Sequence, residues 1–79
     1  MEEMSVKQRV VAALCEVMPD LEKEAVDVSA SFQDLGMDSM DIYFFALKLE
    51  ESYGLDIEDN ILESIKNPED FVKYLEQNL

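Results

Sequence analysis

The sequence predicts an all-α fold, a small four-helix bundle with a long loop between the first and second helices and a short third helix. Three observations lead to this prediction. The chain has 79 residues, of which 48% are apolar, so one small hydrophobic core can form. Apolar residues recur at the spacing of helix turns, and no segment shows the alternation that is typical of strands. We therefore expect a single domain over residues 1–79.

The first helix is expected from about Met4 to Met18, with one face turned to the core. Its predicted buried stripe consists of Val6, Val10, Ala13, Leu14 and Val17. Pro19 interrupts this helix, because proline lacks the N–H that a helix interior needs. A long connection from Asp20 to Met37 follows, and a loop of this length in a small domain is usually functional or held by its own side chains. The residues expected to anchor it to the core are Leu21, Val26, Val28, Phe32 and Leu35.

The second helix is expected to begin at Asp38 or Ser39 and to carry Asp41 in its first turn. It runs to about Tyr53, where Gly54 stops it. At about 100° per residue, this helix has two apolar faces. The face predicted to lie in the core carries Ile42, Phe45, Ala46, Leu49 and Tyr53, and the opposite face carries Met40, Tyr43, Phe44 and Leu47.

The opposite face of this helix has two interpretations. The long loop covers it, or it stays exposed as a binding surface. We expect Leu47 to be partly covered and Tyr43 and Phe44 to be exposed.

A short third helix is expected over Asp59 to Ile65. Asn67 and Pro68 then mark a stop and a restart, since proline is tolerated in the first turn of a helix. The last helix is predicted to turn Phe71, Val72, Leu75 and Leu79 inward.

The charge of the chain limits the kinds of partner that it can bind. Six Lys and Arg stand against nineteen Asp and Glu, a formal net charge of −13. This field repels nucleic acid and anionic membrane surfaces and attracts basic partners. The apolar stretches are too short for a membrane span, and we expect a monomer. Cys15 stands alone and the N-terminus does not resemble a signal peptide, so a cytoplasmic protein is predicted.

Ser39 lies in the stretch DLGMDSMDI, residues 34–42, and has three interpretations: a helix cap, an enzyme nucleophile or a point of attachment. A catalytic serine needs a general base, and the chain has no histidine, so we expect no enzyme. A cap is ordinary at this place. A phosphodiester at the start of a helix would also be favourable, because the helix dipole attracts an anion there. Together with the second apolar face of this helix, this favours the interpretation of Ser39 as a point of attachment. No metal site is expected, because the acidic stretch DIEDNILE lacks the glycine and the ligand spacing of a calcium loop.

The stretch SFQDLGMDSMDIYFFALKLEESYGLDI, residues 31–57, resembles the acyl carrier protein family, whose pattern is a phenylalanine followed by (E/D)-L-G-x-D-S-(L/M) and an acidic, apolar helix. The resemblance extends over nearly the whole chain. It implies that a separate transferase attaches 4′-phosphopantetheine from coenzyme A to Ser39, and that the thiol of this arm holds acyl intermediates as thioesters. The protein would then be a carrier for fatty-acid, specialised lipid or polyketide enzymes.

The resemblance also implies roles for the neighbours of Ser39. Asp38 and Asp41 match positions that meet basic residues on the phosphopantetheinyl transferase and on acyl-loading, condensing and acyltransferase enzymes. Met40, Tyr43 and Leu47 match apolar docking positions. The residues that match the lining of an acyl cavity are Phe45, Ala46, Leu49, Ile57, Leu62, Ile65, Phe71 and Val72.

Phe44 departs from the family pattern, because common fatty-acid carriers have an acidic residue there. This departure points to docking on a narrower set of partners. Two alternatives stay open at this stage: a peptidyl or D-alanyl carrier protein, which shares the fold and the modified serine, and an unmodified acidic helical module that binds other proteins.

Overall fold

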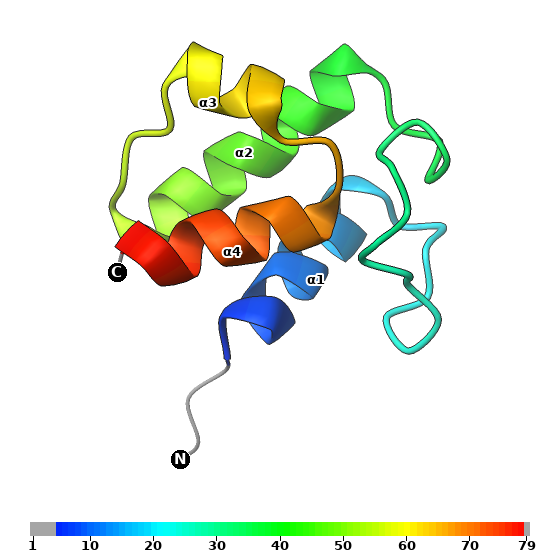
Figure 1. Cartoon of the computed structure of the whole chain (residues 1–79). Coiled ribbons are helices and arrows are strands. Elements are labelled where there is room, and N and C mark those ends of the chain that lie inside the picture. Colours follow the sequence, from blue (N-terminus) through cyan, green and yellow to red (C-terminus); the bar gives the residue numbers. More distant parts are fainter. Residues whose placement is uncertain (1–4, 79) are drawn as a thin grey trace.

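The computed structural model describes residues 5–78, and within them the chain forms four helices and no strand (Figure 1). The helices are α1 (Val6–Val17), α2 (Ser39–Tyr53), α3 (Asp59–Ser64) and α4 (Pro68–Asn78). The predicted all-α fold with a short third helix is therefore confirmed. Met4 and Leu79, which were expected to belong to the first and last helices, lie outside the described residues. None of these helices is long and apolar enough to cross a membrane.

The helix α1 begins with a reciprocal cap that satisfies N–H groups of its first turn. Gln8 N donates to Ser5 Oγ at 3.1 Å, and Ser5 N donates to Gln8 Oε1 at 2.8 Å. The helix then packs against both α2 and α4. Its buried stripe matches the prediction, with Val10, Ala13 and Leu14 in the core and Val6 and Val17 partly buried beside it.

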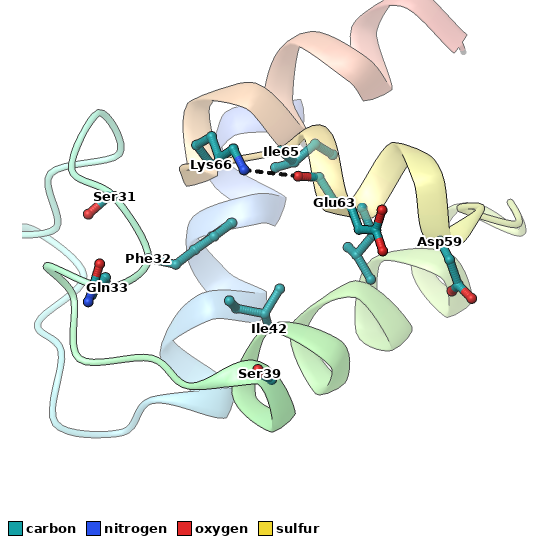
Figure 2. Close-up of a pocket in the computed structure, with 10 residues that line it drawn as sticks. Ser31, Phe32, Gln33, Ser39, Ile42, Asp59, Glu63, Ile65 and Lys66 are labelled. Atoms are coloured by element: carbon teal, nitrogen blue, oxygen red, sulfur yellow. Dashed lines mark hydrogen bonds between the residues drawn. The ribbon is translucent and has the colours of Figure 1, made fainter.

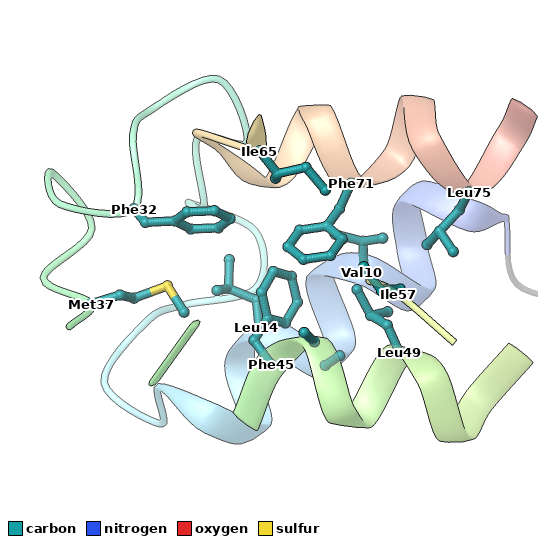
Figure 3. Packing of buried hydrophobic residues seen from close by; sticks show 12 residues of the cluster. Val10, Leu14, Phe32, Met37, Phe45, Leu49, Ile57, Ile65, Phe71 and Leu75 are labelled. Atoms are coloured by element: carbon teal, nitrogen blue, oxygen red, sulfur yellow. The ribbon is translucent and has the colours of Figure 1, made fainter. Parts of the chain in front are cut away.

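Three phenylalanine rings form the centre of the core, one from each of three segments (Figure 3). Phe32 comes from the long loop, Phe45 from α2 and Phe71 from α4. The centroid of Phe32 lies 6.0 Å from those of the other two rings, and the Phe45 and Phe71 centroids are 5.0 Å apart. All three pairs meet edge to face, an arrangement that adds stabilisation beyond the burial of area.

The long loop, cyan to green in Figure 1, is held by main-chain hydrogen bonds as well as by side chains. Phe32 N donates to Lys66 O at 3.1 Å, and Glu69 N donates to Val28 O at 2.9 Å. Phe32 is buried, and the predicted anchors Leu21, Val26 and Leu35 are partly buried against the core. The side chain of Val28 is half-buried but does not join these anchors. This residue holds the loop through its carbonyl instead.

Local signals in the sequence set the ends of the later elements. Gly54 ends α2 in the left-handed region, with a φ of 66°, which glycine adopts without strain. Ile57 N then donates to Glu50 Oε2 at 2.7 Å, which ties the segment before α3 to α2. Ile65 leaves α3 with an extended backbone, so this helix ends one residue before the predicted Ile65. Pro68 is the first residue of α4, as predicted.

Candidate functional site

The start of α2 is capped by Asp38, and Ser39 is the first residue inside the helix. Asp41 N donates to Asp38 Oδ1 at 2.9 Å, and Asp38 N donates to Asp41 Oδ2 at 3.3 Å. Of the two residues that could have capped the helix, Asp38 does so. The Ser39 side chain is exposed, and among residues 5–78 none forms a hydrogen bond with its hydroxyl. The hydroxyl is therefore left free for chemistry at a helix N-terminus.

A pocket of about 530 Å³ opens beside Ser39, between the end of the long loop, the start of α2 and the helix α3 (Figure 2). Its apolar lining comes from Phe32, Ile42, Leu62 and Ile65. Polar side chains complete the lining, namely Ser31, Gln33, Asp59, Glu63 and Lys66. The hydroxyl of Ser39 thus stands at the side of a pocket that offers both apolar area and hydrogen-bonding groups.

Two of the eight residues expected to line an acyl cavity, Leu62 and Ile65, line this pocket. The other six lie elsewhere: Phe45, Ala46, Leu49, Ile57 and Phe71 belong to the buried core, and Val72 packs against it. Apart from Ser39 itself, the other lining residues were not predicted as such, namely Ser31, Phe32, Gln33, Ile42, Asp59, Glu63 and Lys66. Ser31, Phe32 and Gln33 reach the pocket because of the path of the loop and its hydrogen bond to Lys66 O, for which helical periodicity carries no signal.

The outward face of α2 is exposed, and the long loop does not cover it. Met40, Tyr43 and Phe44 are 57%, 50% and 47% exposed, whereas Leu47 is half-buried. The expectations for Tyr43, Phe44 and Leu47 are therefore confirmed. The two aromatic rings lie next to each other, with centroids 6.2 Å apart. This face presents three exposed apolar side chains, and the neighbouring Asp38 and Asp41 carry negative charge.

A second, smaller hollow of about 360 Å³ lies between the end of α1 and this outward face. It is lined by Val17, Asp41, Phe44, Leu47, Lys48 and Glu51. Lys48 Nζ lies 3.4 Å from Glu16 Oε2, an ion pair that joins the two helices at this hollow. Phe44 thus lies where an apolar side chain of a partner could enter, whereas Tyr43 is not part of this lining.

Comparison with known proteins relates this arrangement to one family. The sequence model described as "Phosphopantetheine attachment site" matches residues 8–75, which include Ser39, its capping aspartates and the pocket beside it. The chain belongs to the acyl carrier protein family. An acyl carrier protein of Helicobacter acinonychis (strain Sheeba) is 44% identical over 54 residues, which are 67% of this chain and 69% of that protein. An acyl carrier protein of Helicobacter pylori (strain ATCC 700392 / 26695) is 42% identical over 65 residues, 78% of this chain and 83% of that protein.

Membership of this family makes the chain a carrier of 4′-phosphopantetheine, and not a catalyst. The residues around the start of α2 fit this group. A free, exposed hydroxyl is available to form a phosphodiester, and the N-terminal end of the helix favours the anion. The neighbouring pocket is large enough for part of a flexible arm, and its lining combines apolar and polar groups.

Proposed function

We propose that Ser39 carries the 4′-phosphopantetheine arm and that the protein holds acyl intermediates on it as thioesters. The observation that supports this most directly is the state of the Ser39 hydroxyl. It is exposed and takes no part in capping α2, because Asp38 accepts the hydrogen bond there. It also lies beside the pocket lined by Phe32, Ile42, Leu62 and Ile65. A serine that only capped the helix would instead accept a hydrogen bond from an N–H group of the first turn.

The chain supplies the hydroxyl for attachment and leaves the other chemistry to a partner. In the loading step the oxygen of Ser39 forms a bond to the phosphorus of coenzyme A that is joined to the pantetheine part. The bond between this phosphorus and the oxygen of the nucleotide part breaks, and the nucleotide part leaves. The chain has no histidine to take the hydroxyl proton, so we expect this proton to pass to a base on the phosphopantetheinyl transferase. Ser39 then holds a phosphodiester whose negative charge the start of α2 stabilises.

The acyl group would rest in the pocket beside Ser39. Leu62 and Ile65 are the predicted lining residues that support this placement, together with Ile42 and Phe32. An apolar acyl chain gains free energy there at about 25 cal/mol for each Å² of apolar area removed from water.

The outward face of α2 would dock the enzymes that load and use the arm. Asp38 and Asp41 provide negative charge for basic patches on the transferase and on acyl-loading, condensing and acyltransferase enzymes, and the net charge of −13 steers such partners toward the protein. The apolar docking surface consists of Met40, Tyr43, Phe44 and Leu47. The same net charge keeps copies of the chain apart, which supports a monomer, and the single Cys15 suits a reducing cytoplasm.

Acyl groups are favoured over aminoacyl, peptidyl or D-alanyl groups as the cargo. The relatives are acyl carrier proteins by name, and the pocket beside Ser39 has four apolar residues in its lining. The proposal covers enzymes of fatty-acid, specialised lipid and polyketide synthesis.

Mass spectrometry of the intact protein tests the attachment. The chain is incubated with coenzyme A and a broad-specificity phosphopantetheinyl transferase, together with the variants Ser39→Ala and Ser31→Ala. Ser31 lines the same pocket but should not be modified, so its variant controls for damage to the pocket. We expect the added mass of one arm on the wild-type protein and on Ser31→Ala, and none on Ser39→Ala. An unmodified wild-type protein would instead support the helical interaction module.

A further inference from the structure

The wall of the Ser39 pocket that faces the core is part of the cluster of three phenylalanine rings. Phe32 lines the pocket and also contacts Phe45 and Phe71 in the core. Neither of these two rings lines the pocket, and both are fully buried. Figure 3 shows the ring of Phe32 pointing from the loop toward the other two. An acyl chain that moved inward along Phe32 would therefore meet the other two rings behind it.

The three rings leave little room for an acyl chain to pass. Each ring meets the other two edge to face, with centroids 5.0 to 6.0 Å apart, which is ring contact without a layer of other atoms between them. Protein interiors are packed as densely as organic crystals and resist compression. A chain could pass on this side of the pocket only if at least one of these rings left its place, and Phe45 and Phe71 are fully buried.

We propose that Phe32, Phe45 and Phe71 form an aromatic stopper that limits the cargo to acyl groups short enough to fit in the pocket beside Ser39. This inference rests on the proposed attachment of the arm to Ser39. The pocket has a volume of about 530 Å³, and the thiol end of the arm takes part of this space. We therefore expect the limit near an acyl chain of about octanoyl length.

The polar residues of the pocket also favour short acyl groups over long ones. Gln33, Asp59, Glu63 and Lys66 are exposed and line the pocket together with the apolar residues. A longer apolar chain that cannot enter the core must leave the pocket past these side chains and into water. The methylene groups outside the pocket then gain no burial.

A series of acyl groups of increasing length tests the stopper in the wild-type protein. The transferase is supplied with butyryl-, octanoyl-, dodecanoyl- or hexadecanoyl-coenzyme A, so that the acylated arm is attached in one step. Thermal midpoints are then measured by circular dichroism. We expect the midpoint to rise up to octanoyl and to change by less than about 3 °C from octanoyl to hexadecanoyl. If the four further methylene groups of dodecanoyl entered the core, the midpoint would rise by roughly 10 °C or more, and this result would overturn the stopper.

A pair of variants on α4 tests the role of the ring itself. Phe71→Leu replaces one ring of the stopper by a smaller side chain. Leu75→Ala removes buried volume on the same helix at a residue that does not line the pocket and is not one of the three rings. We expect the midpoint to rise from octanoyl to dodecanoyl in Phe71→Leu and to stay level in Leu75→Ala. If the midpoint did not rise from octanoyl to dodecanoyl in either variant, this result would contradict the proposal.

Nuclear magnetic resonance of the wild-type protein provides a measurement that does not depend on the variants folding. The ring protons of Phe45 and Phe71 should keep their chemical shifts when dodecanoyl replaces octanoyl on the arm, and large changes would show that the chain passes the stopper. The mass spectrum separates this inference from the proposed function. A protein that takes up no arm refutes the attachment, whereas a protein that is acylated and gains stability with every added length refutes only the stopper.

Discussion

Asp38 and Asp41 cap the start of α2 for each other, because each carboxylate accepts a hydrogen bond from the main-chain N–H of the other residue. Two free N–H groups are satisfied in this way without any contribution from Ser39. The residue that we propose to be modified is therefore separate from the residues that hold its helix in place. Attachment and stability should respond to different substitutions.

Substitutions at Ser39 and Asp38 test this separation. Ser39→Ala should prevent attachment of the arm and change the free energy of unfolding by less than about 0.5 kcal/mol, because the exposed hydroxyl has no partner in the described residues. Asp38→Ala should cost about 1 kcal/mol, or a midpoint lower by about 4–8 °C. Asp38→Asn keeps an oxygen that caps the helix and serves as the control. The thermal midpoints of all three variants are measured by circular dichroism. A large loss of stability in Ser39→Ala alone would show that the serine caps the helix after all.

Phe44→Glu should shift the choice of partner without unfolding the protein. Phe44 is 47% exposed and lines the hollow between α1 and α2, so its ring is placed to contact a partner. A buried aromatic anchor at an interface is worth about 2 kcal/mol or more, whereas an exposed charge at the rim is worth about 1 kcal/mol or less. We expect slower turnover with the enzymes that normally use this carrier and faster turnover with general fatty-acid enzymes.

Tyr43→Glu provides the matched control for this substitution. Tyr43 is equally exposed and its ring adjoins that of Phe44, but it does not line the hollow. Its variant should affect turnover less. A fall of several degrees in the thermal midpoint of Phe44→Glu would count against docking, because it would assign Phe44 to the core.

The stability of the protein should increase with ionic strength. With nineteen acidic and six basic residues, the carboxylates repel one another, and the Debye length falls from about 30 Å to about 3 Å between 0.01 M and 1 M salt. We expect the thermal midpoint to rise across this range. Magnesium and calcium at equal ionic strength should act alike, since no group of three metal-binding side chains is found in residues 5–78. A midpoint that does not respond to salt, or a response to calcium alone, would contradict this expectation.

Asp27 should contribute stability that is lost in acid. Ser29 Oγ donates to Asp27 Oδ1 at 2.6 Å and Ser29 N donates to it at 3.0 Å, and these hydrogen bonds lower the pKa of the Asp27 carboxyl in the folded protein. A lowered folded pKa stabilises the protein above the unfolded pKa, and this stability is lost as the pH falls through the folded value, below about pH 4. Asp27→Asn should therefore lose less stability on acidification than the wild-type protein does. Equal acid-induced losses, measured by urea unfolding at several pH values, would show that the turn does not depend on this charge.

Much of the fold could be predicted because local chemistry fixes it. Pro19, Gly54 and Pro68 set helix boundaries through their own backbone preferences, and the helix wheel of α2 placed Tyr43 and Phe44 on the outside. The choice between Asp38 and Ser39 as the cap could not be made from the sequence. Both side chains offer an oxygen to the first turn, and only the position at which the helix begins distinguishes them.

The pocket beside Ser39 could be predicted only in part, because it depends on segments that are distant in the sequence. Leu62 and Ile65 were expected from the family resemblance. Ser31 and Gln33 reach the pocket because Phe32 N bonds to the carbonyl of Lys66, and no local pattern encodes this pairing. The separation of the pocket from the core is set by how three rings meet, which depends on side-chain packing in three dimensions.

The two main-chain hydrogen bonds that join the long loop to the start of α4 also bear on the order of folding. They pair Phe32 with Lys66 and Val28 with Glu69, residues from opposite halves of the chain. Contacts between such distant residues form slowly, because the entropy of closing the intervening chain is lost before the contact stabilises it. We expect the loop to dock only after α2 and its cap, whose hydrogen bonds are local, have formed. A chain in the last stage of folding would then already present Ser39 to a transferase, before the wall of its pocket is complete.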